Sequence, residues 1–168
     1  MLKSFFKKKK KTSLADKNIL VIALLIHAAK IDENYTAVEK KIIIKAIIHL
    51  NEISFDEAEK LLKLAEKKEE ESNQIIEFTK EIKKYSMEFR LNIIEIIWKI
   101  VYSDGASDTY ESNLIRRICG LLYISDKDNG IIKTKETSHG EKQRILTSFG
   151  FQKSFSSKQR FSRDCHTI

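Results

Sequence analysis

The sequence predicts an all-α fold in which about six or seven helices form a single compact bundle. The 168 residues include no proline and only five glycines, and they are rich in isoleucine, leucine, lysine and glutamate, which favour helices joined by short turns. Apolar residues recur three and four positions apart along most of the chain, as on the buried face of a helix. The length suits one domain with a real core.

The first two predicted helices are strongly apolar. The run Ile19–Ile26 leaves the helix of about Asp16–Lys30 almost without a polar face, as expected of a central helix that is covered on all sides. The helix of about Ala37–Leu50 has the same character. The next two predicted helices, from Phe55 to about Glu71 and from Ile75 to Tyr85, carry apolar residues on one face only, so we expect them at the surface.

The last two predicted helices form a second strongly apolar pair. The helix of about Met87–Tyr102 is apolar nearly all round and is the second candidate for a central position. The helix of about Thr109–Leu122 carries an inward face with Leu114, Ile115, Ile118, Cys119 and Leu122. The sequence therefore predicts two similar helix pairs, each joined by a short acidic loop.

An internal repeat supports these two pairs. "IDENYTAVEKKII" (31–43) aligns with "SDGASDTYESNLI" (103–115) at an offset of 72 residues. Asp32 then matches Asp104, and Glu39 matches Glu111. The same helix hairpin appears twice in the bundle.

Helix capping is one interpretation of the acidic loops. Thr36 to Glu39 and Asp108 to Glu111 both match the capping box, in which the first side chain accepts a hydrogen bond from the fourth amide and the Glu reaches back. Ser54 to Glu57 makes the same box where no function is suspected. Capping alone would account for the two Glu positions.

Metal binding is the other interpretation. Asp32 and Asp104 follow a helix C-terminus, where the helix dipole disfavours negative charge, so a lysine or a metal ion is expected nearby. Gly105 would let the chain fold Asp104 back toward Asp108 and Glu111. Oxygen ligands of this kind suit Ca²⁺ or Mg²⁺, although the spacing is not that of an EF-hand.

Several segments resemble the tellurite-resistance protein B (TerB) family. The segments "FDEAEKLLKLAEKKEEES", "YSMEFRLNIIEIIWKIVYSDG", "SDGASDTYE" and "ESNLIRRICGLLYISDKD" occur in the order that this family has, and the resemblance covers about residues 14–128. It implies an all-helical domain with two pseudo-equivalent helix pairs, a role in tellurite resistance and stress responses, and no established catalytic reaction.

The resemblance also implies divalent-metal ligands in both acidic loops. Carried over position by position, they are Asp32 and Glu39 in the first loop and Asp104, Asp108 and Glu111 in the second. The first loop departs from the pattern, because Glu33 replaces the expected glycine and Thr36 stands where the second loop has Asp108. It should therefore turn less freely and offer one ligand fewer.

The basic residues lie mainly at the two ends of the chain. The net charge is +7, but residues 1–12 contribute +6 and residues 129–168 contribute +5, which leaves −4 for the body between them. We expect residues 1–13 to be a disordered basic segment, 14–128 the folded domain, and 129–168 a disordered basic tail with scattered phenylalanines. Either end could instead bind nucleic acid, an anionic membrane surface or a protein partner.

The remaining polar residues do not suggest an enzyme. His27, His49, Trp98 and Cys119 lie in apolar helical patterns and are interpreted as core or boundary residues. No nucleophile with a base and no phosphate-binding loop has support in the sequence. Lys7–Lys11 before the apolar run resembles a signal peptide, but that run is about half the ~20 residues that span a bilayer. We therefore predict a cytoplasmic, non-catalytic domain that binds a divalent metal through its acidic loops and has stress-response partners. The alternative is a metal-independent adaptor that uses its acidic face or its basic ends.

Overall fold

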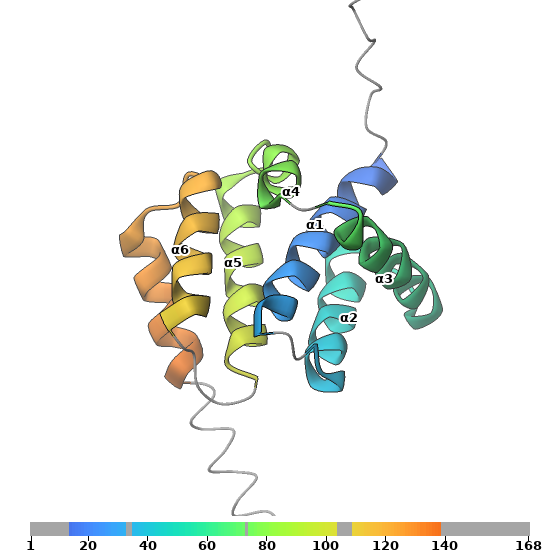
Figure 1. Ribbon diagram of the computed structural model, residues 1–168, viewed down its shortest axis with the longest axis horizontal. Helices are drawn as coiled ribbons and strands as arrows, with labels where there is room; N and C mark the ends of the chain where they lie inside the picture. Colours follow the sequence, from blue (N-terminus) through green and yellow to red (C-terminus); the bar gives the residue numbers. More distant parts are fainter. Residues whose placement is uncertain (1–13, 33–34, 73, 104–108, 139–168) are drawn as a thin grey trace, which may run out of the picture.

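The computed structural model describes residues 14–32, 35–72, 74–103 and 109–138. Figure 1 shows that these residues form a bundle of helices, and the described part of the chain contains no strand. The bounds of the helices are α1 Leu14–Ala29, the short 3-10 helix η1 Lys30–Asp32, α2 Ala37–Asn51, α3 Phe55–Glu70, α4 Ile75–Ile82, α5 Met87–Val101 and α6 Thr109–Leu121. A last helix covers residues 126–138. The all-α prediction is confirmed, and most predicted helix ends lie within one or two residues of the observed ones.

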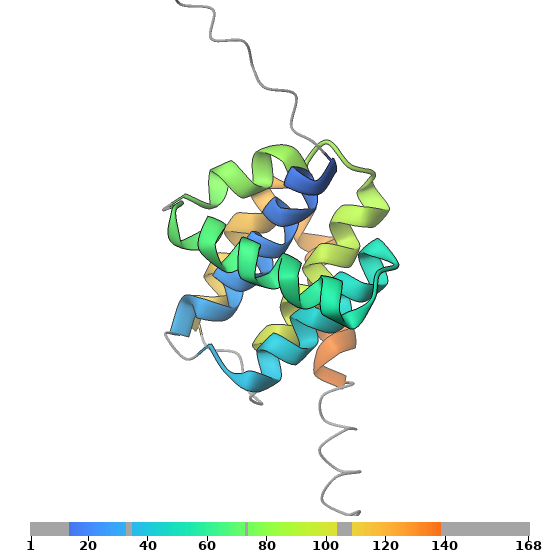
Figure 2. The ribbon, with the colours of Figure 1, turned by 90° about the vertical axis from the view of Figure 1, so that its right-hand side faces the viewer.

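Helices α1 and α5 form the centre of the bundle. Helix α1 contacts α3, α4 and α5 most extensively, and α5 also contacts α2 and α6. Between Leu20 and Ala29 every residue of α1 except His27 is buried. Figures 1 and 2 show α2 and α3 on one side of this centre and α6 with the last helix on the other. Helix α1 can therefore lack a polar face, because each side of it packs against another helix, as the sequence predicts.

The two surface helices behave as predicted. Helix α3 buries Ala58, Leu62 and Ala65 and exposes most of its charged residues, whereas Glu66, Lys68 and Glu69 are partly buried. Helix α4 buries Ile75, Phe78, Thr79 and Ile82, whereas Ile76 is half exposed. None of the described helices is long and apolar enough to cross a membrane.

The folded domain extends further than the sequence predicts. Asn129 was expected to begin a disordered tail, but residues 126–138 form a helix with Ile132 and Glu136 buried. Ser125 caps this helix, because its hydroxyl oxygen accepts a hydrogen bond from the Asp128 amide at 3.1 Å. The boundary expected after Asp128 therefore falls inside a helix. Residues 1–13 and 139–168 lie outside the described residues, and so do their predicted roles.

Tertiary contacts hold this last helix in place. The indole Nε1 of Trp98 on α5 donates a hydrogen bond to Asn129 Oδ1 at 2.9 Å, and Lys133 Nζ lies 5.0 Å from the centre of the Trp98 ring. Lys135 forms an ion pair with Glu95 of α5 at 3.0 Å. Trp98 is buried, as its interpretation as a core residue requires, but it also joins the last helix to α5.

Candidate functional site

The helix ends that flank the two acidic loops lie at one end of the molecule. Figures 1 and 2 show the C-terminal ends of α1 and α5 and the first turns of α2 and α6 gathered at the lower end in both views. We call these four helix ends the acidic end. The internal repeat is thus reproduced in space, because equivalent ends of the two hairpins face the same way.

The first hairpin has a complete capping box at this end. Thr36 Oγ1 accepts a hydrogen bond from the Glu39 amide at 3.2 Å, and Glu39 Oε2 accepts bonds from the Thr36 amide at 2.7 Å and from its hydroxyl at 2.8 Å. Glu39 is only 7% exposed. One oxygen of this predicted metal ligand is therefore committed to the cap, as the capping interpretation predicts.

Asp32 is the last residue of η1, the single 3-10 turn that follows α1. It therefore lies at the C-terminal end of the first central helix, as expected. Lys30 in the same turn is a candidate for the compensating cation, but its ammonium binds Glu69 Oε2 at 2.8 Å and lies 3.8 Å from Glu70 Oε1. The carboxylates of α3 thus engage Lys30, which is the lysine closest to Asp32 in the sequence.

Glu69 of α3 binds two residues at the C-terminal end of α1, Lys30 and His27. Its second oxygen lies 3.0 Å from His27 Nδ1, and the Glu69 side chain is only 11% exposed. Burial alone would raise the pKa of Glu69, but the hydrogen bonds from Lys30 and His27 outweigh it and lower that pKa below its ordinary value. His27 is thus a boundary residue with one nitrogen satisfied, as predicted.

A second polar group lies beside these contacts. Lys40 of α2 forms an ion pair with Glu66 of α3 at 3.2 Å, and its ammonium lies 4.5 Å from the centre of the Tyr35 ring. Burial, and then the negative charge of Glu66, raise the pKa of the Tyr35 phenol. The phenol therefore stays protonated over the physiological range and offers a neutral oxygen rather than a phenolate.

The second hairpin buries an equivalent glutamate. Glu111 lies in the first turn of α6 and is 7% exposed, the same fraction as its repeat partner Glu39. Asp104 and Asp108 lie outside the described residues, and so does the capping box predicted for Asp108. Of the five predicted ligands, the structure therefore places Glu39 and Glu111 in equivalent first turns and Asp32 at the end of η1.

The described residues offer oxygen donors but not a complete metal site. Among the side chains that the structure describes, which do not include that of Asp32, no three of His, Cys, Asp or Glu gather in a way that would hold a metal ion. The carboxylates at the acidic end are nevertheless the donors that Ca²⁺ and Mg²⁺ prefer. A site there would need ligands from the loop that contains Asp104 and Asp108.

The sequence analysis missed the carboxylates of α3 that line this end. Glu66 and Glu69 were not singled out from the sequence, yet Glu66 binds Lys40, and Glu69 binds Lys30 and His27. Their spacing could have predicted that they face inward, because Glu66 and Glu69 continue the buried stripe of Leu62 and Ala65 at spacings of three and four residues.

Comparisons with known proteins identify the domain. The family model described as "Tellurite resistance protein TerB" matches residues 18–134, which includes most of the last helix. No curated protein and no solved structure gave a match to the chain. The matched span covers well over half of the 168 residues, and it contains α2 to α6 whole and all of α1 except its first four residues. The chain therefore belongs to the TerB family.

Proposed function

We propose that this protein is a non-catalytic domain that binds a divalent cation at its acidic end and acts in the response to tellurite or other stress. The observation that carries the proposal is the burial of Glu39 and Glu111, which are both 7% exposed at repeat-equivalent positions. These two carboxylates come from the two halves of the internal repeat and lie in the first turns of α2 and α6, so equivalent oxygen donors stand at the same end of the bundle. Carboxylate oxygens are the ligands that Ca²⁺ and Mg²⁺ prefer.

Oxygen donors gather around the first hairpin. Glu66, Glu69 and Glu70 of α3 lie in ion pairs with Lys30 of η1 and Lys40 of α2. Carboxylate oxygens of this kind are the ligands that Ca²⁺ and Mg²⁺ prefer, so a cation at this end would find suitable donors.

Calorimetric titration tests the proposal directly. We expect Ca²⁺ or Mg²⁺ to give a binding heat with the full chain, and Asp104→Asn to abolish or strongly weaken it. Asp56→Asn is the matched control, because Asp56 is an exposed acid in the first turn of α3. If the wild-type protein and Asp104→Asn give the same absence of heat, the carboxylates serve as helix caps and the metal proposal fails.

The first loop gives an internal comparison. Thr36 replaces an Asp and Glu33 replaces a Gly in this loop, so it should contribute less to the affinity. We expect Asp32→Asn to reduce binding less than Asp104→Asn. Equal losses would mean that both loops share one ion.

A metal-independent adaptor is the second candidate, and exposed apolar residues at the acidic end favour it. Val38 is 54% exposed and Tyr110 is 68% exposed, and each directly precedes the buried glutamate of its hairpin. Exposed apolar side chains beside acidic groups suit contact with a basic protein surface. The test is capture of stress-response proteins on the immobilised wild type and on the Val38→Ser/Tyr110→Ser variant. Proteins that bind the wild type both with and without EDTA, and that do not bind the variant, would support this role.

The proposed setting is the cytoplasm. Cys119 is a free thiol packed in the core, which suits a reducing compartment. Binding of nucleic acid or an anionic membrane by the basic ends stays a prediction, because residues 1–13 and 139–168 lie outside the described residues.

A further inference from the structure

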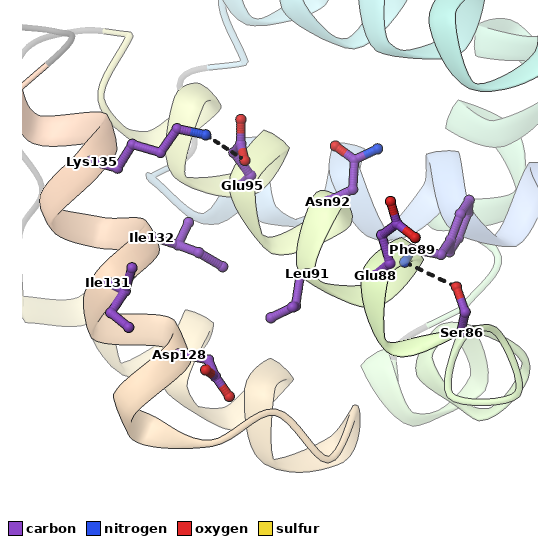
Figure 3. Close-up of a pocket in the computed structure, with 10 residues that line it drawn as sticks. All are labelled: Ser86, Glu88, Phe89, Leu91, Asn92, Glu95, Asp128, Ile131, Ile132 and Lys135. Atoms are coloured by element: carbon purple, nitrogen blue, oxygen red, sulfur yellow. Dashed lines mark hydrogen bonds and ion pairs between the residues drawn. The ribbon is translucent and has the colours of Figure 1, made fainter.

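A hollow on the opposite side of α5 from α1 lies outside the acidic end. Figure 3 shows it between the first half of α5 and the helix of residues 126–138. Its volume is about 680 Å³, and its apolar lining comes from Phe89 and Leu91 of α5 and from Ile131 and Ile132 of the facing helix. We call this hollow the α5 groove.

The α5 groove leaves apolar surface in contact with water. Ile131 is 59% exposed, and Phe89 and Leu91 are only partly buried. Figure 3 shows Leu91 and Ile132 extending from opposite walls toward the open space between them, with Ile131 beside Ile132 on the same helix. Covering such surface is favourable by roughly 25 cal/mol for each Å² removed from water, so a binding segment would gain from resting here.

The rim of the groove is acidic. Glu88, Glu95 and Asp128 line it against a single lysine, Lys135, which closes one end through its 3.0 Å contact with Glu95. Glu88 is exposed on the first turn of α5, at the other end of the groove. An occupant with apolar side chains and positive charge would therefore complement both the floor and the rim.

The chain itself contains such a segment directly after the groove. Residues 139–168 hold six Lys or Arg against two acids, and they include Phe149, Phe151, Phe155 and Phe161. The wall helix is described to residue 138, so the eleven residues from there to Phe149 can span up to roughly 36 Å. The stretch of α5 from Ser86 to Glu95 that lines the groove is about 14 Å long, so this reach is ample.

We propose that the α5 groove binds the chain's own segment 149–161, with phenylalanines against Leu91 and Ile131 and cations near Glu88 and Asp128. A segment tethered this closely acts at an effective concentration of about a millimolar or more, so weak contacts suffice. The same segment of a second copy is the competing occupant, and it would require association between molecules.

The two cysteines make a direct test feasible in the full chain. Cys119 is 1% exposed, and burial followed by the nearby negative charge of Asp126 raises the pKa of its thiol to about 12. Cys165, four residues after Phe161, is therefore the thiol that a nitroxide reagent labels in the native protein. The nitroxide weakens the NMR signals of backbone amides that come close to it.

We expect the label to weaken the amide signals of residues 88–92 and 131–132 several-fold more than those of α3. Ile131→Ser should remove this selective loss, whereas Ile76→Ser should keep it. Ile76 of α4 is the matched control, because it is 50% exposed and lies outside the groove. Both substitutions are at exposed positions, and the unchanged signals of the core report that each variant is folded.

Two results would overturn the proposal. A weak and uniform loss of signal over the whole surface would show that segment 149–161 does not settle in the groove. A mixture of isotope-labelled protein without nitroxide and unlabelled protein with nitroxide detects contact between molecules. If this mixture reproduces the selective loss, the occupant belongs to a second copy and binding in cis is refuted.

Discussion

The hydrogen bond between Trp98 and Asn129 should make residues beyond 128 essential to the stability of the domain. Asn129→Ala removes the acceptor that lies 2.9 Å from Trp98 Nε1. Trp98 is 1% exposed, so the indole N–H has little access to water as a replacement. Leaving a buried donor without its partner costs about 1 to 3 kcal/mol in the free energy of unfolding. For a domain of this size, each kcal/mol corresponds to a fall of about 4 °C in Tm.

Urea denaturation followed by circular dichroism measures this loss without relying on the single tryptophan. A double-mutant cycle with Trp98→Phe separates the hydrogen bond from the packing of the ring, and we expect a coupling energy of about 1 kcal/mol. Thr134→Ala is the control in the same helix, because Thr134 is exposed and its hydroxyl bonds only to Gly130 of that helix. An Asn129→Ala variant as stable as the wild type, or a coupling energy of zero, would show that the last helix does not pack on α5.

Three further predictions concern the acidic end and the core. Thr36→Ala should lower the free energy of unfolding by about 1 kcal/mol through loss of the cap on α2, and Thr36→Ser should restore it in thermal melts. Because the pKa of Glu69 is lowered, its ion pairs stabilise the fold above the ordinary value of 4.5 and are lost as the pH falls through the folded-state pKa. The difference in unfolding free energy between wild type and Glu69→Gln should therefore shrink below about pH 4.5. A difference that stays constant with pH would contradict these ion pairs. At pH 8 the native protein should have one thiol that reacts with Ellman's reagent, and the urea-unfolded protein should have two. The reason is that burial raises the pKa of the Cys119 thiol to about 12. Rapid reaction of both thiols in the native protein would refute the burial of Cys119.

Much of the fold could be predicted because its signals are local in sequence. The apolar run of α1 and the isoleucines of α5 identified the two central helices, since a helix without a polar face must be covered on all sides. The capping box of Thr36 and Glu39 was predicted from a spacing of three residues, and the structure confirms each of its hydrogen bonds. The family was also predicted, because several segments of the pattern occur in the right order.

The candidate site could be predicted only in part. Glu39 and Glu111 were identified from the repeat, and their equal burial in space agrees with that repeat. Glu66 and Glu69 were not identified as part of this end, because their partners His27, Lys30 and Lys40 lie on other helices and tens of residues away. A charged residue on a helix reveals its exposure through local spacing, but its ion pair depends on which helix packs beside it.

The sequence by itself determined the helices, their caps, the two hairpins and the family, since each depends on residues within a few turns of one another. Only the tertiary structure decided that residues 129–138 belong to the domain. Their sequence has weak helical periodicity, and their helix is held by contacts to Trp98 and Glu95, which lie 31 and 40 residues away. The same packing creates the α5 groove, because a hollow between two helices exists only once they are brought together.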